Sequence, residues 1–174
     1  MNNPIVRLTV CQGDDKTEEL GQITLELYPD KAPETVRNFL SLVEREFYNG
    51  LIFHRVIRGF MIQGGGMTPA FGEKPARSIR GEFIANGFMA NDIKHKRGVI
   101  SMARTNDPES ASSQFFIMHD DAPHLDGQYA AFGRVTEGMD VVDKIANVRT
   151  GRYGWYSDVP KTPVVITKAE IIPE

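Results

Sequence analysis

The chain has 174 residues, and its 41% hydrophobic and 25% charged residues are typical of one globular domain spanning residues 1–174. The formal net charge of −3 argues against nucleic acid or an anionic membrane as the main partner, because either would favour a strongly basic chain. The one cysteine, Cys11, cannot form an internal disulfide bond, and its place at the end of an apolar segment predicts a small buried or edge residue.

The N-terminal segment, M-N-N-P-I-V-R-L-T-V, has neither a basic leader nor a long apolar run, so we expect no secretory signal. No apolar stretch elsewhere approaches the length that spans a bilayer. These observations predict a cytoplasmic protein.

Two alternating segments near the N-terminus predict an antiparallel hairpin. In Ile5–Val10 and again in Ile23–Tyr28, every second side chain is apolar, as in a half-buried strand. The polar segment Gln12–Glu19, which contains Asp14 and Asp15, predicts the turn between them.

A helix is predicted between Pro33, near its start, and Gly50, past its end. Its apolar residues fall at i, i+3, i+4, i+7 and i+11 and form one stripe: Val36, Phe39, Leu40, Val43 and Phe47. We expect this helix to cover an open end of a sheet or barrel and to carry no chemistry.

The segment Phe53–Gly66, F-H-R-V-I-R-G-F-M-I-Q-G-G-G, predicts two short strands that meet at Arg58-Gly59 and end in three glycines. Its composition is unusual for a plain core hairpin. Arg55 and Gln63 interrupt apolar runs, and neither side chain is expected to be fully buried without partners.

Strand periodicity places Met61 and Gln63 on one face of the second strand and Phe60 and Ile62 on the other. A guanidinium and an amide beside such residues indicate an apolar pocket with a few aimed donors. The alternative is that Arg55 is a surface arginine whose aliphatic part lies along the strand.

Residues 64–97 form a glycine-rich stretch with no sustained periodicity, which is typical of a long loop that is either functional or disordered. A phosphate-binding loop would need the spacing G-x-x-x-x-G-K-[ST], which is missing. Close approach of backbone around a pocket is the better interpretation of Gly64, Gly65 and Gly66.

The remaining elements are three short strands, a second helix and a last strand that Pro163 opens. Thr136 is the predicted cap of that helix, whose stripe is Met139, Val142, Ile145 and Ala146. The count is eight strands and two helices, which predicts a mainly β fold, a closed antiparallel barrel capped by two helices. The three short strands are Val99–Met102, Gln114–Met118 and Tyr129–Val135.

The segment F-H-R-V-I-R-G-F-M-I-Q-G-G resembles the signature of the cyclophilins, peptidyl-prolyl cis-trans isomerases built on an eight-stranded barrel. Ser112–Gly127, S-S-Q-F-F-I-M-H-D-D-A-P-H-L-D-G, resembles the other pocket wall of that family. Gly98–Thr105, G-V-I-S-M-A-R-T, resembles the version in bacterial members. The resemblance runs from about Ile5 to the C-terminal strand and implies a rotamase that needs no cofactor and no metal.

The resemblance assigns the catalytic hydrogen-bond donor to Arg55. It implies that four side chains line a pocket for the proline ring, and that Gln63 holds the carbonyl side of the substrate together with Gln114 and the backbone around Ala103 and Arg104. The four lining residues are Phe60, Met61, Phe116 and Leu125.

Three positions depart from the best-known eukaryotic pattern. His124 stands in place of a tryptophan, Tyr129 in place of a histidine, and Arg104 in place of an asparagine. Tyr129 can keep an aromatic wall with a polar tip. The indole that normally donates a hydrogen bond to the inhibitor cyclosporin is replaced by His124, so we expect weak cyclosporin binding.

The histidines do not indicate a metal site or a hydrolase. His119 and His124, with Asp120 and Asp121 between them, could suggest a metal site, but their spacing matches no zinc pattern. His54 is expected to point away from the side of Arg55 and to be structural. No G-x-S-x-G motif supports a hydrolase triad.

Two further hypotheses compete with an isomerase that assists protein folding. A binding module could hold proline-bearing segments without turnover, and a barrel could serve only as a docking platform. Arg55 favours catalysis, because proline binding alone would need only the apolar wall. The expected partners are proline-containing peptides and unfolded or partly folded proteins, with neither nucleic acid nor membrane, and the expected state is a monomer.

Overall fold

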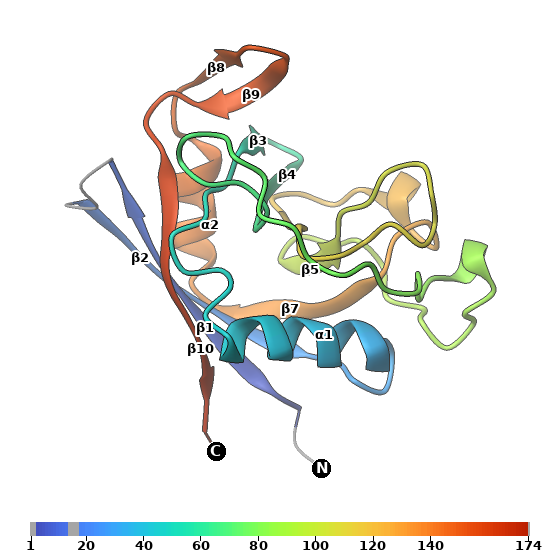
Figure 1. Cartoon of the computed structure of the whole chain (residues 1–174). Coiled ribbons are helices and arrows are strands. Elements are labelled where there is room, and N and C mark those ends of the chain that lie inside the picture. Colours follow the sequence, from blue (N-terminus) through green and yellow to red (C-terminus); the bar gives the residue numbers. More distant parts are fainter. Residues whose placement is uncertain (1–2, 14–17, 174) are drawn as a thin grey trace.

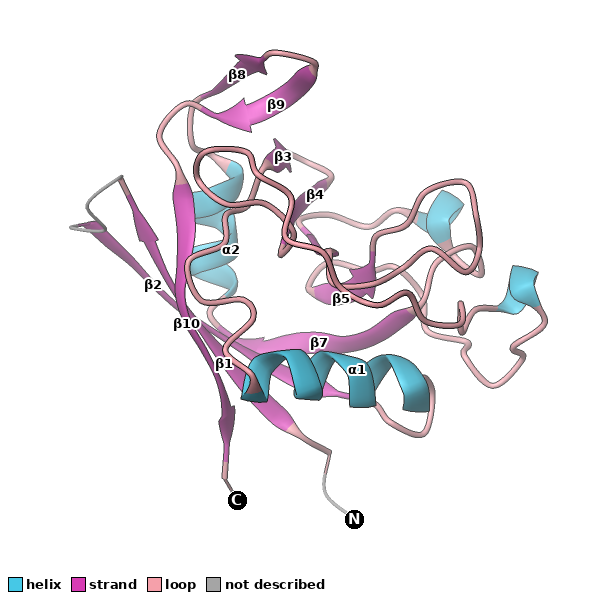
Figure 2. Cartoon of the chain, in the orientation of Figure 1, coloured by secondary structure: helices cyan, strands magenta, loops and turns pink. Residues whose placement is uncertain are grey.

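The computed structural model describes residues 3–13 and 18–173 (Figure 1). Its main element is an eight-stranded sheet, antiparallel at every pair, in the order β10-β1-β2-β7-β5-β6-β4-β3. A separate hairpin pairs the two remaining strands, β8 and β9 (Figure 2). The strands are β1 Ile5–Gln12, β2 Glu18–Leu27, β3 Arg55–Ile57, β4 Met61–Gly64, β5 Val99–Met102, β6 Phe115–Met118, β7 Ala131–Glu137, β8 Thr150–Tyr153, β9 Tyr156–Pro160 and β10 Val164–Ile172.

The sheet curls into a half-barrel, and the expected closed barrel is wrong in that respect. Strands β10 and β3 are its two edges. In the described part of the chain, β3 and β10 do not pair with each other, and the segment before β3 contacts β10 through an isolated bridge between Ile52 and Val165 and hydrogen bonds such as Phe53 N–H to the Val164 carbonyl (2.9 Å). A local pattern of alternation predicts strands, but sheet closure depends on curvature and register over the whole sheet.

The N-terminal hairpin of β1 and β2 is confirmed, as is the buried position of Cys11. The predicted turn at Asp14 and Asp15 lies outside the described residues. The eight strands expected for the main sheet are confirmed, and the β8–β9 hairpin adds two strands that the sequence did not predict. Its sequence, T-G-R-Y-G-W-Y-S-D-V-P, does not alternate, and most of its side chains are exposed, so no burial pattern indicated it.

The first helix, α1, spans Pro33–Glu44 and ends earlier than its apolar stripe. The stripe continues because Glu46 adopts a left-handed φ of 59° and turns Phe47 back onto the core. The N-terminus of the helix has no local side-chain cap. The buried carboxylate of Glu82 accepts the Thr35 N–H (2.7 Å) instead, and such a distant cap cannot be read from local sequence.

The second helix, α2, spans Met139–Ala146, and its N-cap is Gly138 rather than the predicted Thr136. Gly138 has a φ of 100°, and a β-carbon there would collide with the Gln22 carbonyl of β2. Glycine is therefore required by backbone conformation and by close approach. None of the helices in the described residues is long and apolar enough to cross a membrane.

Strands β4, β6 and β5 bury both of their faces. Ile62, Ile117 and Ile100, which are aligned across the three strands, belong to the main core. In that core, the ring of Phe39 from α1 packs against two rings of the sheet. Its centroid lies 5.1 Å from that of Phe132 and 5.7 Å from that of Phe115. The opposite face of these strands carries a second, smaller hydrophobic cluster that includes Met61, Phe116, Met118 and Leu125.

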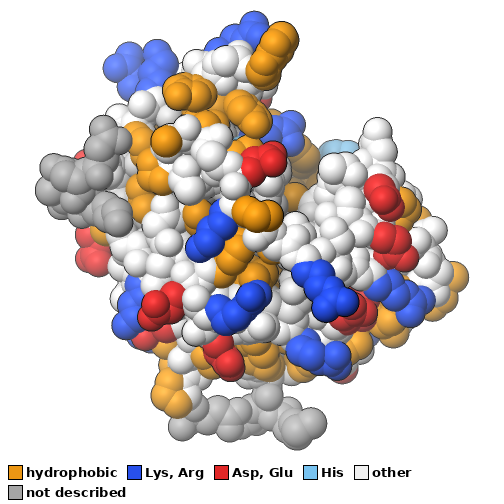
Figure 3. Space-filling view, in the orientation of Figure 1, with side chains coloured by type: hydrophobic (Ala, Val, Ile, Leu, Met, Phe, Trp, Pro, Cys, Tyr) orange, Lys and Arg blue, Asp and Glu red, His pale blue; other side chains and the backbone are white. Residues whose placement is uncertain are grey.

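The β8–β9 hairpin projects from the end of the sheet beside β3 (Figure 1). Hydrophobic and basic side chains are visible over it in the space-filling view (Figure 3). Three of the most exposed large hydrophobic residues of the described chain belong to this hairpin: Tyr153, Trp155 and Tyr156.

Candidate active site

A row of residues crosses four strands on the face opposite the main core. Arg55 of β3 is paired with Gln63 of β4, Gln63 with Phe116 of β6, and Phe116 with Ser101 of β5. Directly paired residues share a face of a sheet. Register alone therefore brings a guanidinium, an amide and an aromatic ring side by side.

An open cavity of about 130 Å³ lies over this row and is called the site pocket below. It is lined by nine of the residues that the sequence singled out. They are Arg55, Phe60, Met61, Gln63, Ala103, Arg104, Phe116, Leu125 and Tyr129. Its apolar walls are the solvent end of the second hydrophobic cluster, so their positions are fixed by packing beneath.

The predicted faces of β4 are confirmed for three of four residues. Met61 and Gln63 line the site pocket, and Ile62 points into the main core. Periodicity put Phe60 on the face of Ile62, but Phe60 lines the pocket, as the resemblance to the cyclophilins implied. It precedes the strand, in the turn where its N–H donates to the Ile57 carbonyl, so strand periodicity does not apply to it.

Two predicted residues lie at the margin of the site pocket. His124 is exposed and stacks on Phe60, with ring centroids 5.9 Å apart. Gln114 lines an adjoining cavity of about 300 Å³ and accepts a hydrogen bond from Nε2 of Gln63 (3.1 Å). The two cavities share Gln63, Ala103 and Arg104, so they form one continuous surface.

The Arg55 side chain is exposed at the pocket mouth. Within residues 3–13 and 18–173, its guanidinium has neither a hydrogen-bond partner nor an ion pair. Arg104, by contrast, is fixed: Nη2 donates to the Gln128 carbonyl (2.7 Å), and the guanidinium lies over the Tyr129 ring at 4.7 Å. One pocket arginine is thus available to a ligand, and the other holds the wall together.

The glycines after β4 permit close approach, as the sequence indicated. Gly65 has a φ of 91°, and a β-carbon there would lie 2.8 Å from the Phe115 ring. A β-carbon on Gly66 would collide with the side chain of Gln114. A side chain at either position would push the pocket wall or the core aromatic ring out of place.

Behind Phe116 lies a buried polar cluster that sequence reasoning missed. The His95 ring stacks on Phe116 with centroids 5.9 Å apart and an interplanar angle of 19°. Its Nε2 is 2.9 Å from the Ser101 hydroxyl, and its Nδ1 is 3.3 Å from Asp126. Burial lowers the pKa of His95, against an opposing effect of the Asp126 carboxylate, so the ring is neutral near pH 7.

The contacts of Ser101 with His95 and of His95 with Asp126 follow the order of a hydrolase triad, but the surroundings do not support hydrolysis. Ser101 is fully buried, and the imidazole lies under Phe116, so no substrate reaches the hydroxyl. The cluster instead supports the pocket floor. Its sequence signal was weak, because His95 stands in the run K-H-K-R, which is typical of an exposed loop.

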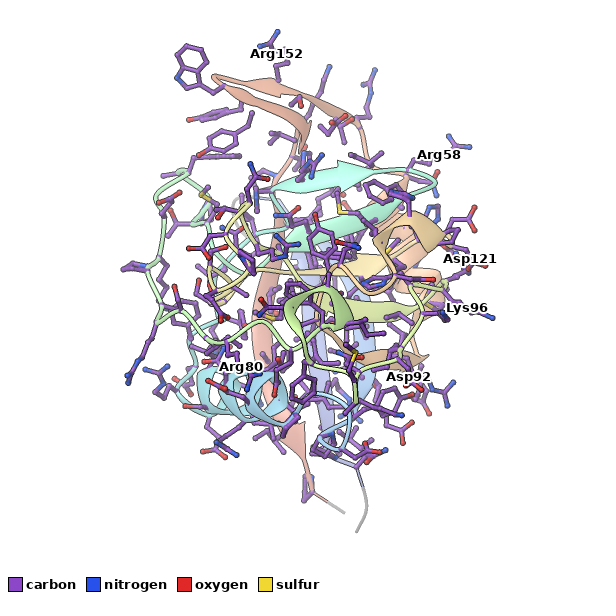
Figure 4. All side chains as sticks on the ribbon, turned by 90° about the vertical axis from the view of Figure 1, so that its right-hand side faces the viewer. Arg58, Arg80, Asp92, Lys96, Asp121 and Arg152 are labelled. Atoms are coloured by element: carbon purple, nitrogen blue, oxygen red, sulfur yellow. The ribbon has the colours of Figure 1, made fainter. Side chains whose placement is uncertain are left out.

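His119 anchors the turn between β3 and β4. Its Nδ1 accepts the Gly59 N–H (2.8 Å), and its Nε2 is 3.1 Å from Asp143 of α2. Arg97 completes the contact with two hydrogen bonds of 2.9 Å to the same carboxylate. Figure 4 looks onto this side of the molecule, with Arg58 on the β3–β4 hairpin. Both ring nitrogens of His119 are therefore engaged in holding the hairpin.

His54 points away from the site pocket, as expected. It is buried, and its ring lies 6.5 Å from that of Tyr156 in an edge-to-face arrangement. Burial, with a smaller effect of neighbouring Arg55, lowers the pKa of His54 to about 4. In the described residues, Nδ1 of His54 has no hydrogen-bond partner, so the neutral ring is strongly favoured.

The fold and the pocket define a class of protein: a curled antiparallel sheet with two helices that carries an apolar slot with polar side chains at its mouth. The chain belongs to the cyclophilin-type peptidyl-prolyl cis-trans isomerases, whose family model matches residues 14–171. Membership makes it an enzyme of the peptidyl-prolyl cis-trans isomerase class.

Relatives and solved structures agree with this assignment. The peptidyl-prolyl cis-trans isomerase of Acinetobacter baylyi is 50% identical over 158 residues, covering 87% of this chain and 81% of that protein. Peptidyl-prolyl cis-trans isomerase B of Escherichia coli is 46% identical over 160 residues, covering 87% and 94%. A cyclophilin type peptidyl-prolyl cis-trans isomerase of Cryptosporidium parvum superposes with a TM-score of 0.81 at 27% identity over 99% of both chains. Its structure in the presence of the dipeptide Ala-Pro gives 0.80 at 28% identity over 98% of this chain and 99% of that one.

Proposed function

We propose that the chain accelerates rotation about Xaa-Pro bonds by aiming the Arg55 guanidinium at the prolyl nitrogen of a substrate held in the site pocket. Isomerisation needs no bond to the substrate to form or break. The barrier of roughly 18–20 kcal/mol arises from amide resonance, which is lost when the C–N bond twists. The catalyst must therefore bind the twisted amide better than either planar form.

Arginine suits this role for an electronic reason. In the planar amide, the nitrogen lone pair is delocalised and accepts poorly. In the twisted amide, the nitrogen becomes pyramidal and recovers its lone pair, so a fixed donor stabilises the transition state selectively. The guanidinium is permanently charged and presents its donors in a rigid fork. A single charged donor of this kind contributes about 3–4 kcal/mol, or a factor of about 10²–10³ in rate.

The other pocket residues fix one side of the bond while the other side turns. The proline ring lies against Phe116, Met61, Phe60 and Leu125, with Tyr129 closing the wall. Gln63 and the backbone around Ala103 hold the carbonyl side. Gln114 positions the Gln63 amide by accepting its N–H. The observation that supports the proposal is the cross-strand row, in which Gln63 pairs with Arg55 on one side and with Phe116 on the other, while the Arg55 guanidinium has no partner among the described residues.

The test is the cis-to-trans rate of a short Xaa-Pro peptide, measured by NMR exchange with wild type, Arg55→Ala and Arg58→Ala. Arg58 is the matched control, since it is an exposed arginine of the same hairpin that does not line the pocket. We expect strong acceleration by wild type and by Arg58→Ala, and a loss of about 10²-fold or more in Arg55→Ala. Peptide binding without acceleration by folded wild type would instead indicate a binding module.

The physiological substrates that fit this pocket are proline-containing segments of unfolded or partly folded chains, and the role we propose is assistance to folding, by a monomer in the cytoplasm. An open pocket accepts an extended chain, which a folded protein seldom presents. Refolding limited by proline isomerisation would be faster with wild type than with Arg55→Ala.

A further inference from the structure

The β8–β9 hairpin presents a hydrophobic surface that the isomerase reaction does not use. Trp155 is 96% exposed, Tyr153 54% and Tyr156 37%, and these three residues are called the hairpin patch below. Full exposure of a tryptophan leaves its apolar area in water. The orange side chains at the top of Figure 3 lie over this hairpin.

The hairpin patch is held firmly from beneath. Phe71 stacks on Tyr153 with centroids 4.3 Å apart and an interplanar angle of 20°, and lies 5.4 Å from Tyr156. The backbone is ordered by pairing of β8 with β9. Trp155, at the tip, is therefore displayed on a support of paired strands and stacked rings, which lowers the conformational entropy that is lost when a partner binds.

The hairpin patch lies next to the site pocket. Strand β9 packs against β3, and the ring of Tyr156 faces that of His54, the residue before Arg55. The loop that carries Phe71 continues into Glu73 and Lys74, which line the adjoining cavity. The packing of β9 against β3 therefore places the hairpin patch beside the segment that carries Arg55.

The charge around the hairpin patch is positive although the chain is acidic. Residues 149–161 contain three exposed basic residues and one acid, in a chain of net charge −3. The acid is Asp158, whose carboxylate accepts a hydrogen bond from Ser157 (3.4 Å). Arg152 lies at the top of Figure 4, above Arg58. The basic residues are Arg149, Arg152 and Lys161.

We propose that the hairpin patch is a docking surface for the substrate chain itself, taking an apolar and acidic segment of an unfolded client whose proline occupies the site pocket. This inference rests on the proposed function. The patch exposes roughly 400 Å² of aromatic surface, which is well below the ~800 Å² per partner of a stable dimer. Three cations are also fewer than the about six to ten phosphate contacts of a typical nucleic-acid binder.

Docking next to the pocket raises the local concentration of prolines from the same chain. A segment held at Trp155 keeps its neighbouring Xaa-Pro bonds within reach of Arg55 through several encounters. We therefore expect the hairpin patch to lower the KM for long unfolded substrates. We expect it to have no effect on the turnover of short peptides.

The test compares peptides with one Xaa-Pro centre. One is a tetrapeptide. The others carry an extension of about eight residues on the N-terminal or the C-terminal side of the Xaa-Pro centre. The extension is either apolar and acidic or, as a control, made of glycine and serine. We expect the apolar-acidic extension, on one of the two sides, to raise kcat/KM about fivefold to tenfold by lowering KM. A change of this size corresponds to the contribution of one aromatic residue to an interface. Trp155→Ser should remove that gain. Met89→Ser, which removes an apolar side chain 71% exposed outside the hairpin, should not.

Binding is followed independently by fluorescence, because Trp155 is the one tryptophan of the chain. We expect its emission to shift to the blue with the apolar-acidic extension and not with the tetrapeptide. An equal kcat/KM for all peptides, or a gain that persists in Trp155→Ser, would overturn the proposal. So would a stronger shift with a single-stranded oligonucleotide, or self-association that Trp155→Ser abolishes. Failure of wild type to turn over the tetrapeptide would count against the proposed function instead.

Discussion

The site pocket and the hairpin patch are both aromatic, but they hold their rings in opposite ways. Phe116 is 5% exposed and lies on a buried histidine, whereas Trp155 is 96% exposed and only its neighbours are packed. The pocket is built from four strands of the main sheet, and the patch from one added hairpin. The contrast indicates that precise geometry is needed where a bond must be twisted, and accessible area where a chain must only be held.

Replacing the pocket floor gives the largest expected effect. Phe116→Ala removes the ring that faces the substrate proline and leaves a cavity above His95, so we expect kcat/KM to fall by about 10²-fold and the free energy of unfolding by about 3 kcal/mol. Phe116→Leu, a milder change, should lose less stability and still lose activity. Its matched control is Phe132→Leu in the main core, which should lower stability but not kcat/KM. Equal activity losses in the two leucine variants would mean that the ring acts only through stability.

The pH dependence of stability tests the segment just before β3, where His54 contacts Tyr156 of the hairpin. The pKa of His54 is about 4 in the folded protein, against about 6.5 in an unfolded chain. Between these values the unfolded state binds more protons, so stability falls as pH falls from about 6.5 to about 4. We expect a loss of roughly 2–3 kcal/mol in this window, with His95, whose pKa burial also lowers, contributing in the same direction. Urea denaturation of His54→Gln across the window should show a shallower pH dependence, and an unchanged slope would contradict this assignment.

We expect the rim of the site pocket to determine the affinity for cyclosporin. His124 stacks on Phe60 where the best-known family members carry the tryptophan that donates to the drug. We expect weak binding by wild type and an affinity at least about tenfold higher for His124→Trp, which corresponds to one added hydrogen bond of about 1.4 kcal/mol. Isothermal titration calorimetry measures both. Tight binding by wild type, or no gain in the variant, would show that this position is not decisive.

The smallest expected effect is on the stability of the hairpin. Trp155 makes almost no contact with the rest of the described chain, so Trp155→Ser should change the free energy of unfolding by less than about 0.5 kcal/mol. Tyr153→Ser, which removes the ring stacked on Phe71, should cost more. Thermal unfolding of both variants would separate a displayed residue from a supporting one, and equal losses would place Trp155 in the packed structure.

The sequence predicted the residues that line the site pocket better than it predicted the parts around them, for physical reasons. Arg55 and Gln63 were visible because polar residues interrupt strands whose other side chains are apolar. His95 was not, since its charged neighbours conceal a side chain that is buried from several directions by distant strands. The β8–β9 hairpin lacked alternation because most of its side chains face solvent. Sheet closure and the Glu82 cap depend on contacts remote in sequence, which no local pattern encodes.

The central claim is that the Arg55 guanidinium stabilises the twisted amide more than it binds the planar peptide. The direct measurement is the cis–trans exchange rate of an Xaa-Pro peptide bound to saturating Arg55→Ala, together with its Kd, by NMR. The account predicts a Kd within about threefold of wild type and a bound exchange rate lower by about 10²-fold or more, as for an interaction made in the transition state. An unchanged exchange rate, or a loss that lies entirely in Kd, would contradict it.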